Sequence, residues 1–373
     1  MKIVLISGHD GASDRKTGFH FWAEILARRG HDVDFLTVGS SWISLIRKNG
    51  KQLKPPFNRW VSLAPRVRKF TWMPPFHPLY LGNRILDILS TPLFSLYPWL
   101  MPPALLKSVR EADVFIIENG AGQMLVPRLA KINPDARIIF NSCDRPSVLS
   151  FHPLIVRSEK TMLPYLDAIR LNAALMAEDF PAGTETHYIA QAIDKSLFDA
   201  PMDNPYKTGK NAINVGDMIF DARAVEILAG HFTDWTFHLF GKGARIGAPM
   251  PNVVEHGEVP FSKLIPYLKY ADIGLSPYKN SPKAAYLGQS SLKNVQYTYC
   301  RLPIVAPQIA AGSRPHIISY TSSDDEQSVI DAFEKAIALD RSTIDQSVVP
   351  SWEDVIDRML ALAEDGRAKR TKA

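Results

Sequence analysis

An aspartate at the end of a predicted strand is the first candidate for chemistry. Asp144 stands in the segment NSCDRPS, residues 141–147, directly after the apolar run at residues 137–141. A carboxylate in this place can take the proton from an acceptor hydroxyl while a sugar is transferred, the general-base role that an inverting displacement requires. A lone aspartate beside a strand is also a common helix cap, so the spacing leaves both interpretations open.

The second candidate is the segment SPYKNSPKAAYLGQSSLKNVQYTYCRLPIVAP, residues 276–307. Its pattern predicts a strand, a long polar loop, a helix at residues 292–299 and a strand introduced by Pro303. A polar loop that opens into a helix is a frequent binding site for anions, because the helix N-terminus presents unpaired N–H groups and the positive end of the helix dipole.

The start of this helix carries the side chains that suit a diphosphate. Ser290 or Ser291 lies near the first turn, and Lys293 adds a cation within it. Gln296, one turn further along the same face, can reach a ribose hydroxyl. The alternative is an ordinary amphipathic helix whose lysine is solvated.

Glycine motifs help to decide which classes of protein fit this sequence. The GKG at residues 241–243 follows a predicted strand and could let a turn approach a phosphate closely, although such glycines are also common structural features. The chain has no GxGxxG after its first strand and no GxxxxGK[ST] anywhere. A dinucleotide-dependent dehydrogenase and a P-loop NTPase are therefore disfavoured.

Alternating strands and helices must position these residues. The N-terminus predicts a strand at residues 2–7, a polar loop at 8–18, a helix at 19–29 and a strand at 32–38, which together form a βαβ unit. In the rest of the first half we expect strands at 114–118, 137–141, 168–171 and 187–189, and helices at 123–131 and 155–163. This alternation is typical of a doubly wound parallel sheet.

A linker-like segment divides the chain. Residues 199–210, DAPMDNPYKTGK, are rich in proline and polar residues, and the α/β alternation restarts after them. There we expect strands at 212–215, 236–240, 253–256, 273–276 and 304–306, and helices at 222–229, 262–270, 292–299 and 352–363.

The predicted fold is thus α/β with two Rossmann-like doubly wound domains that face each other across a cleft. The expected domains are residues 1–200, 201–350, and a C-terminal helix with a basic tail at 351–373 that crosses back to the first domain. Ligands of such sheets bind beyond the carboxyl ends of the strands, so the cleft is the expected site.

Composition supports a globular enzyme in a reducing compartment. The chain has 373 residues, of which 46% are hydrophobic and 22% charged, and the prior of roughly 100 to 200 residues per domain favours two cores. Only Cys143 and Cys300 occur, far apart in sequence, so both are expected to be free thiols. We find neither a secretory signal pattern nor about 18 uninterrupted apolar residues that could span a membrane.

Basic residues are concentrated between Ser41 and Arg110, where eleven lysines and arginines stand against Asp87 alone. Aromatic residues are interleaved with them, including Trp60, Trp72 and Phe76. This favours attachment to an anionic membrane surface, since aromatics settle at the interface and cations meet acidic headgroups. Binding of nucleic acid, or a lid whose aromatics form a core, are the alternatives.

Several segments taken together resemble a known family. They are SGHD near the N-terminus, NPDARIIFNSCD, VGDMIFD, WTFHLFGKG, HGEV, SPY and YLGQSSLKNVQY. With them the chain resembles the xanthan β-glucuronosyltransferase GumK and related bacterial exopolysaccharide glucuronosyltransferases, which have the GT-B fold. The resemblance extends over nearly the whole chain and is loosest in the basic aromatic region.

The resemblance implies an inverting transfer of glucuronic acid from UDP-glucuronate to a polyprenyl-diphosphate-linked oligosaccharide, with Asp144 as general base and neither a metal nor a cofactor. It also implies a cytoplasmic protein, peripheral on the inner face of the bacterial inner membrane, with no nucleic-acid partner. The residues that match the family's UDP contacts are Met218, Glu258, Tyr278, Leu287, Ser291, Leu292, Lys293 and Gln296.

Two departures from the family pattern affect these expectations. The loop GASDRKTG after His9 and Asp10 differs, which leaves the acceptor sugar undetermined, and Arg301 replaces a usual glycine in the turn from helix to strand. The alternative functions are a GT-B transferase that uses another UDP-hexose and a non-catalytic module that binds membranes or nucleic acid.

Overall fold

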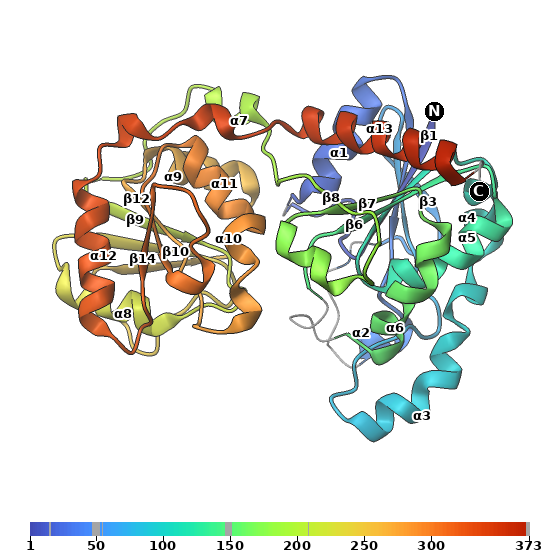
Figure 1. Ribbon diagram of the computed structural model, residues 1–373, viewed down its shortest axis with the longest axis horizontal. Helices are drawn as coiled ribbons and strands as arrows, with labels where there is room; N and C mark the ends of the chain where they lie inside the picture. Colours follow the sequence, from blue (N-terminus) through green and yellow to red (C-terminus); the bar gives the residue numbers. More distant parts are fainter. Residues whose placement is uncertain (15, 47–52, 54, 146–150, 208, 371–373) are drawn as a thin grey trace. The chain divides into compact units, whose positions relative to one another are not determined.

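The computed structural model describes residues 1–14, 16–46, 53, 55–145, 151–207 and 209–370. The chain folds into two compact units (Figure 1). Unit 1 combines Met1–Ile189 with Trp352–Ala373, and unit 2 comprises Ala190–Ser351. Each unit is an α/β layer structure around its own sheet, which confirms the predicted α/β class with two sheets.

Unit 1 is built on an eight-stranded sheet in the order β3-β4-β2-β1-β5-β6-β7-β8. The strands are β1 (Lys2–Ser7), β2 (Asp32–Thr37), β3 (Trp60–Ala64), β4 (Val67–Thr71), β5 (Val114–Glu118), β6 (Arg137–Ser142), β7 (Ala168–Leu171) and β8 (His187–Tyr188). All neighbouring pairs are parallel except β3 with β4. The central strands are continuous apolar runs because helices cover both faces of the sheet.

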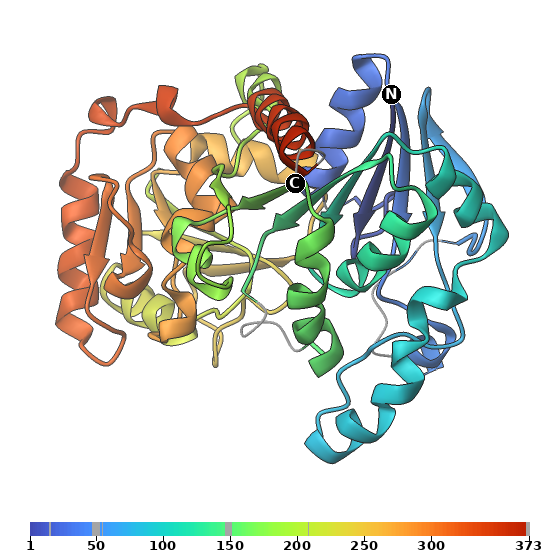
Figure 2. The same cartoon turned by 45° about the vertical axis from the view of Figure 1, so that its right-hand side comes forward.

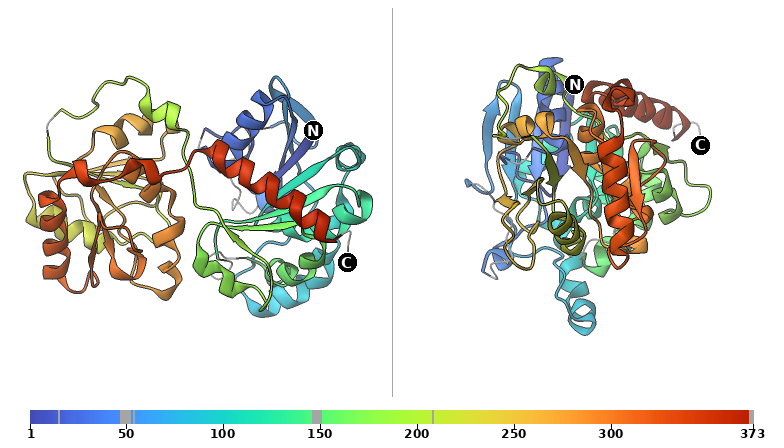
Figure 3. Two further views of the ribbon diagram at one scale, coloured as in Figure 1. Left: turned by 45° about the horizontal axis from the view of Figure 1, so that its top comes forward. Right: turned by 90° about the vertical axis from the view of Figure 1, so that its left-hand side faces the viewer.

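The helices of unit 1 lie on both faces of this sheet (Figure 3, left). Helices α1 (Gly18–Arg28) and α13 (Trp352–Arg370) cover one face, and α4 (Pro103–Arg110), α5 (Val126–Ile132) and α6 (Pro153–Met162) cover the other. Two further helices are α2 (Trp42–Ile46) and α3 (Arg84–Ser95). Figure 2 shows α3, in cyan, projecting away from the strands of its unit.

Helix α13 packs on unit 1 through a close backbone approach and an aromatic contact. A Cβ atom on Gly366 would lie only 1.7 Å from the carbonyl oxygen of Asp167, so only glycine fits there. At the start of the helix, the buried Trp352 stacks on Phe21, with ring centroids 6.0 Å apart, and meets the edge of Trp22. The C-terminal segment therefore completes the core of unit 1.

Strands β3 and β4 place part of the basic aromatic segment in this sheet, where several of its cations pair with carboxylates. Arg66 pairs with Asp32, and Arg68 forms a two-bond pair with Asp34. Lys69 is buried in an ion pair with the carboxylate of Asp10, at 2.9 Å.

The carboxylates that pair with these cations come from outside the segment. The count of lysines and arginines along the segment therefore overstated its unpaired positive charge. Trp72, expected to insert into lipid, is instead buried against Tyr97. Four other cations of the segment, Arg47, Lys48, Lys51 and Lys54, lie outside the described residues.

Unit 2 is built on a six-stranded parallel sheet in the order β11-β10-β9-β12-β13-β14. The strands are β9 (Asn211–Val215), β10 (Thr236–Phe240), β11 (Val253–Gly257), β12 (Ile273–Leu275), β13 (Ile304–Pro307) and β14 (Ile317–Tyr320). The helices are α7 (Lys195–Asp199), α8 (Ala222–His231), α9 (Phe261–Tyr270), α10 (Leu287–Ser290), α11 (Leu292–Tyr299) and α12 (Glu326–Ala338). Helices α8 and α12 pack on one face of the sheet, while α9 and α11 pack on the other (Figure 1).

The strand orders define where ligands are expected in each unit. In unit 1 the direction of strand addition reverses between β1 and β5, and in unit 2 it reverses between β9 and β12. Loops on opposite sides of such a switch point diverge and leave a crevice at the carboxyl ends of the strands. The residues that follow these strands are therefore the expected ligand contacts.

Candidate functional site

The residues expected to contact UDP all belong to unit 2, and several follow strands at its switch point. Met218 lies in the turn after β9, and Tyr278 follows β12. Ser291, Leu292 and Lys293 form the start of α11. The sequence motifs from three separated segments are thus gathered around one end of the sheet.

Lys293 is the central electrostatic feature of this group. Its side chain is buried, its Nζ donates to Oδ1 of Asn214 on β9 at 3.0 Å, and it lies 4.4 Å from the centroid of the Tyr278 ring. Burial lowers the pKa of Lys293 to about 7, while the nearby Asp217 opposes that shift. Within the described residues no carboxylate forms an ion pair with it, so an anionic ligand can stabilise its charge.

A second set of contacts ties the turn after β9 to the loop after β12. The Tyr278 hydroxyl and Ser291 Oγ share a hydrogen bond of 2.9 Å, which fixes the ring beneath Lys293. Phe220 forms an isolated bridge with Tyr278, and the N–H of Lys279 donates to the carbonyl of Ile219 at 2.8 Å. Met218 is therefore held near Tyr278 by the backbone, with its side chain partly exposed.

The remaining four predicted contacts differ in their surroundings. Leu287 on α10 and Gln296 on α11 are buried, and Leu292 is half-buried. Glu258 is exposed just after β11, which is separated from β9 by β10. Glu258 thus lies along the same edge of the sheet, two strands away from β9.

Sequence reasoning missed two polar residues of this group, Asn214 and Asp217. Asn214 anchors Lys293, and Asp217 accepts the N–H of Gly243 at 2.7 Å. The GKG glycines therefore have a structural role: a Cβ atom on Gly241 would lie 3.2 Å from the backbone of Gly216. The VGD motif after β9 was the available signal for Asp217.

Asp144 lies at the carboxyl end of β6 in unit 1 and is half-buried. Its carbonyl oxygen accepts a hydrogen bond from Nδ2 of Asn119, the residue after β5, at 3.1 Å. The last two residues of the NSCDRPS segment lie outside the described residues. The structure thus places Asp144 at the edge where ligands of a parallel sheet bind, one strand away from the switch point.

A glutamate and a cysteine also lie at this edge of the sheet of unit 1. Glu118, at the end of β5, accepts a hydrogen bond from Ser7 Oγ at 2.5 Å, across the switch point. Burial raises the pKa of the Cys143 thiol well above its usual value, with Glu118 and Asp144 adding to that shift. This shift favours the protonated thiol of Cys143, which is the weaker nucleophile.

Comparison with known proteins shows which proteins this chain is similar to. Residues 5–172 match the family described as "Glucuronosyltransferase GumK, N-terminal domain". The chain is 28% identical over 358 residues to the UDP-glucuronate:glycolipid 2-beta-glucuronosyltransferase of Xanthomonas campestris pv. campestris, an alignment that covers 96% of this chain and 88% of that protein.

Solved structures with the same architecture include two trehalose-phosphate synthases. For OtsA the TM-score is 0.57 at 13% identity, with 100% of this chain and 99% of that chain covered. For the UDP-forming enzyme of Burkholderia xenovorans it is 0.55 at 13% identity, with the same coverage. At this identity the likeness shows the fold alone, the GT-B fold. In sequence, this chain is similar to the GumK-like glucuronosyltransferases, and in fold it has the GT-B architecture.

Proposed function

We propose that this protein transfers glucuronic acid from UDP-glucuronate to a polyprenyl-diphosphate-linked oligosaccharide, with inversion at the anomeric carbon. The similarity to an enzyme named for UDP-glucuronate and a glycolipid supports the substrate classes. In this proposal Met218, Tyr278, Ser291, Lys293 and their neighbours in unit 2 bind the donor.

The observation that carries the proposal is the buried Lys293. A cation held in a dry site by a neutral amide and an aromatic face is costly without an anion, and a diphosphate supplies that anion. The positive end of the α11 dipole adds to the same attraction. As the bond to the diphosphate breaks, negative charge grows on the leaving oxygen, and these groups stabilise it.

The proposed reaction is a single displacement. The acceptor hydroxyl oxygen bonds to the anomeric carbon as the bond from that carbon to the UDP oxygen breaks. Asp144 takes the hydroxyl proton, and UDP leaves with the bonding electrons. Attack from the face opposite UDP inverts the anomeric configuration.

The test uses Asp144→Asn, which retains the shape and loses the basicity. Transfer of labelled glucuronate to lipid-linked oligosaccharide should fall at least about 100-fold, while calorimetry should give wild-type affinity for UDP. Turnover of UDP-glucose in parallel decides the donor: a preference for UDP-glucose would support the alternative UDP-hexose. Near wild-type transfer by Asp144→Asn would exclude it as the base.

We also propose that the protein works on the inner membrane surface and that helix α3 is the element that contacts lipid. No helix in the described part of the chain is both long and apolar enough to cross a bilayer. On α3 and the turn after it, however, apolar side chains are 46 to 69% exposed. They are Ile85, Leu86, Ile88, Leu89, Leu93, Leu96 and Trp99.

On α3 most apolar side chains face outward and the acidic side chain faces inward, which is the reverse of an ordinary surface helix in a soluble protein. Its only acidic residue, Asp87, is buried and accepts the backbone N–H of Leu81 at 3.0 Å. Of its charged side chains, Arg84 alone is exposed, so the outward face is apolar with a cation at its end. A contiguous exposed apolar face of this kind is typical of an interfacial helix on anionic lipid.

Vesicle sedimentation tests this surface with Leu89→Ser and Ile85→Ser. Each side chain is about two-thirds exposed, so each change should weaken binding to anionic vesicles by roughly 1 to 2 kcal/mol. Ile337→Ser, at an exposed position on α12 in unit 2, is the matched control and should bind like wild type. Equal binding of all four proteins to the vesicles would refute the role of α3.

A further inference from the structure

The loop that carries Asp144 is held by an asparagine from the neighbouring strand. Asn119 directly follows β5, which pairs in parallel with β6. Its Oδ1 accepts the backbone N–H of Cys143 at 3.0 Å, and its Nδ2 donates to the carbonyl of Asp144 at 3.1 Å. One side-chain amide thus bonds two successive residues of the loop, including the proposed base.

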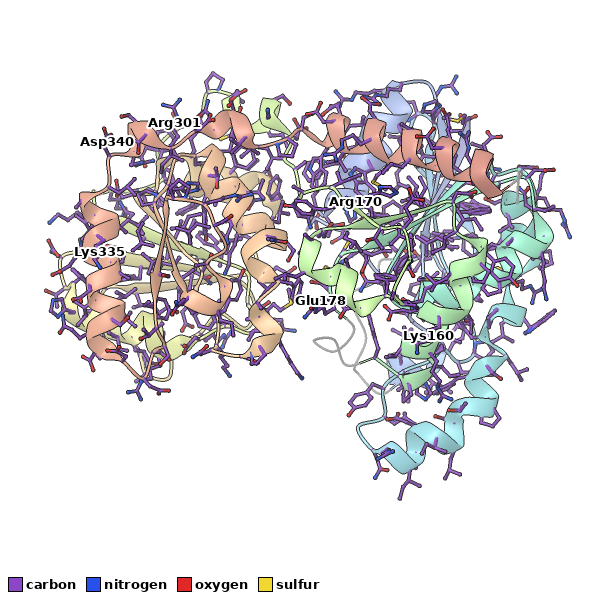
Figure 4. The ribbon with its side chains drawn as sticks, in the orientation of Figure 1. Lys160, Arg170, Glu178, Arg301, Lys335 and Asp340 are labelled. Atoms are coloured by element: carbon purple, nitrogen blue, oxygen red, sulfur yellow. The ribbon has the colours of Figure 1, made fainter. Side chains whose placement is uncertain are left out.

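The other side of the loop is anchored as well. Asn172 directly follows β7, is fully buried, and donates from Nδ2 to the carbonyl of Cys143 at 3.4 Å. Arg145 donates to the carbonyl of Leu175 at 2.6 Å and pairs with Glu178, at 3.4 Å, on the turn Ala174–Asp179. Figure 4 labels Glu178 on this turn and Arg170 on β7.

Arg170 anchors the carboxyl end of β6 by a hydrogen bond. Its guanidinium is buried in the sheet and donates to Oδ1 of Asn141 at 2.6 Å. Asn141 in turn donates to Sγ of Cys143 at 2.8 Å. The residues on both sides of Asp144 are therefore tied to β5, β7 and the turn after β7.

We propose that Asn119 is a positioning residue that sets the place of the Asp144 carboxylate. The inference rests on the proposed function, in which Asp144 is the base. A general base acts only within hydrogen-bond reach of the proton that it removes, and displacement of a reacting group by about 1 Å can cost about 100-fold in rate. Among these anchoring side chains, Asn119 is the one whose amide donates to the backbone carbonyl of Asp144.

The role requires an amide in particular. The side chain at position 119 must accept from one N–H and donate to one carbonyl at the same time, which asparagine does and aspartate does not. An aspartate would keep the bond to Cys143 but would place a carboxylate oxygen against the carbonyl of Asp144. It would also add a negative charge next to Glu118.

The experiment compares Asn119→Ala and the isosteric Asn119→Asp with a matched asparagine. Asn133 of unit 1 is buried, whereas Asn119 is half-buried, and it too donates from Nδ2 to backbone carbonyls, those of Val109 and Ala112. It precedes β6 and lies away from Asp144. Glucuronate transfer is measured from labelled UDP-glucuronate to polyprenyl-diphosphate-linked oligosaccharide. Both Asn119 variants should lower kcat about tenfold or more with an unchanged KM for UDP-glucuronate, whereas Asn133→Ala should lower Tm and leave kcat unchanged.

A double variant separates this inference from the proposed function. If Asn119 acts through Asp144, then Asn119→Ala combined with Asp144→Asn should be no slower than Asp144→Asn alone. Multiplied losses in the double variant, equal losses of kcat in Asn119→Ala and Asn133→Ala, or wild-type kcat in both Asn119 variants would each overturn the positioning role. An active Asp144→Asn would instead overturn the proposed base.

Discussion

Lys293 shows how burial prepares a single residue for a charged ligand. In the unligated protein its charged form is destabilised by the loss of water, and its pKa is lowered to about 7 by that burial. A bound diphosphate would stabilise the charged form and raise this pKa again. With the diphosphate bound as proposed, the lysine would therefore take up a proton as the donor binds.

The first prediction is that UDP binding takes up a proton above neutral pH. From about pH 7 upward, the affinity should fall by up to about tenfold per pH unit, because the neutral lysine must be protonated when UDP binds. Below pH 7 the lysine is charged in both states, and this dependence disappears. Calorimetry at pH 8 in two buffers of different ionisation enthalpy measures the proton uptake.

The free energy of unfolding of the unligated protein should change with pH in the direction opposite to the affinity for UDP. The unfolded lysine titrates near its usual pKa of about 10.4, so between about pH 7 and 10 the unfolded state binds more protons. The contribution of Lys293 to the free energy of unfolding therefore rises with pH in this window. Lys293→Met should remove both effects, and the same proton uptake in this variant would assign it to another group.

At the scale of elements, the turn after α11 contains a local strain. Arg301 has a φ of 54°, in the left-handed region that favours glycine, and the N–H of the next residue, Leu302, bonds back to the carbonyl of Tyr297 at 2.9 Å. The carbonyl of Arg301 accepts from Nε of Arg341, which a glycine would also allow. The departure from the family's glycine therefore has a cost at this position.

The second prediction is that Arg301→Gly stabilises unit 2. Relief of the left-handed strain should add about 0.5 to 1 kcal/mol to its free energy of unfolding and raise its Tm by about 1 to 4 °C. The matched control is Lys335→Gly, an exposed position within α12 that Figure 4 also labels. There a glycine should destabilise by about 1 kcal/mol, and calorimetric Tm changes of the same sign in both variants would contradict the argument.

Sequence analysis predicted correctly the bounds of the elements whose hydrophobic pattern is simple. Strand β1, with its unbroken apolar run, has the expected bounds of 2–7, and α11 has the expected 292–299. Buried parallel strands follow from local rules alone, whereas the long polar loop expected before α11 was wrong, because it contains the short helix α10. The predicted α/β alternation around β1 and β2 was confirmed for the same reason.

The elements that sequence analysis missed depend on partners far along the chain. Strands β3 and β4 were read as a basic surface because their anionic partners, Asp32 and Asp34, lie on β2. Helix α3 has its polar side inward, opposite to the pattern used to detect helices. The contact of Asn119 with the loop that carries Asp144 could be recognised only from the register of β5 against β6. The roles of Asp144 and of the UDP contacts stay predictions.

On the scale of the whole molecule, unit 1 is discontinuous and unit 2 is continuous in sequence. The face of α1 that carries Phe21 and Trp22 is covered by Trp352, which follows all of unit 2 in the chain. Helix α13 continues this contact through Val355, Ile356, Met359 and Ala363, all buried. The stability of unit 1 therefore depends on a distant segment.

The third prediction is that Trp352→Ala destabilises unit 1 selectively. Loss of a buried tryptophan costs about 3 to 5 kcal/mol, so the Tm of unit 1 should fall by on the order of 10 °C. Scanning calorimetry with UDP, which should raise the transition of unit 2 alone, assigns the two transitions. Trp235→Ala, buried against Phe333 in unit 2, should lower the other transition instead. A single transition shifted equally by both changes would show that the units unfold together.

The position of Trp352 in the chain also sets an order of events during synthesis. At about 5 to 20 residues per second, the ribosome needs roughly 10 to 30 seconds to make Ala190–Ser351 after the last strand of unit 1. During that interval Phe21 and Trp22 have no tryptophan to cover them, while unit 2 emerges as an unbroken sequence. The half that is translated first is thus the half that matures last, and its uncovered aromatic face is where a chaperone would bind the nascent chain.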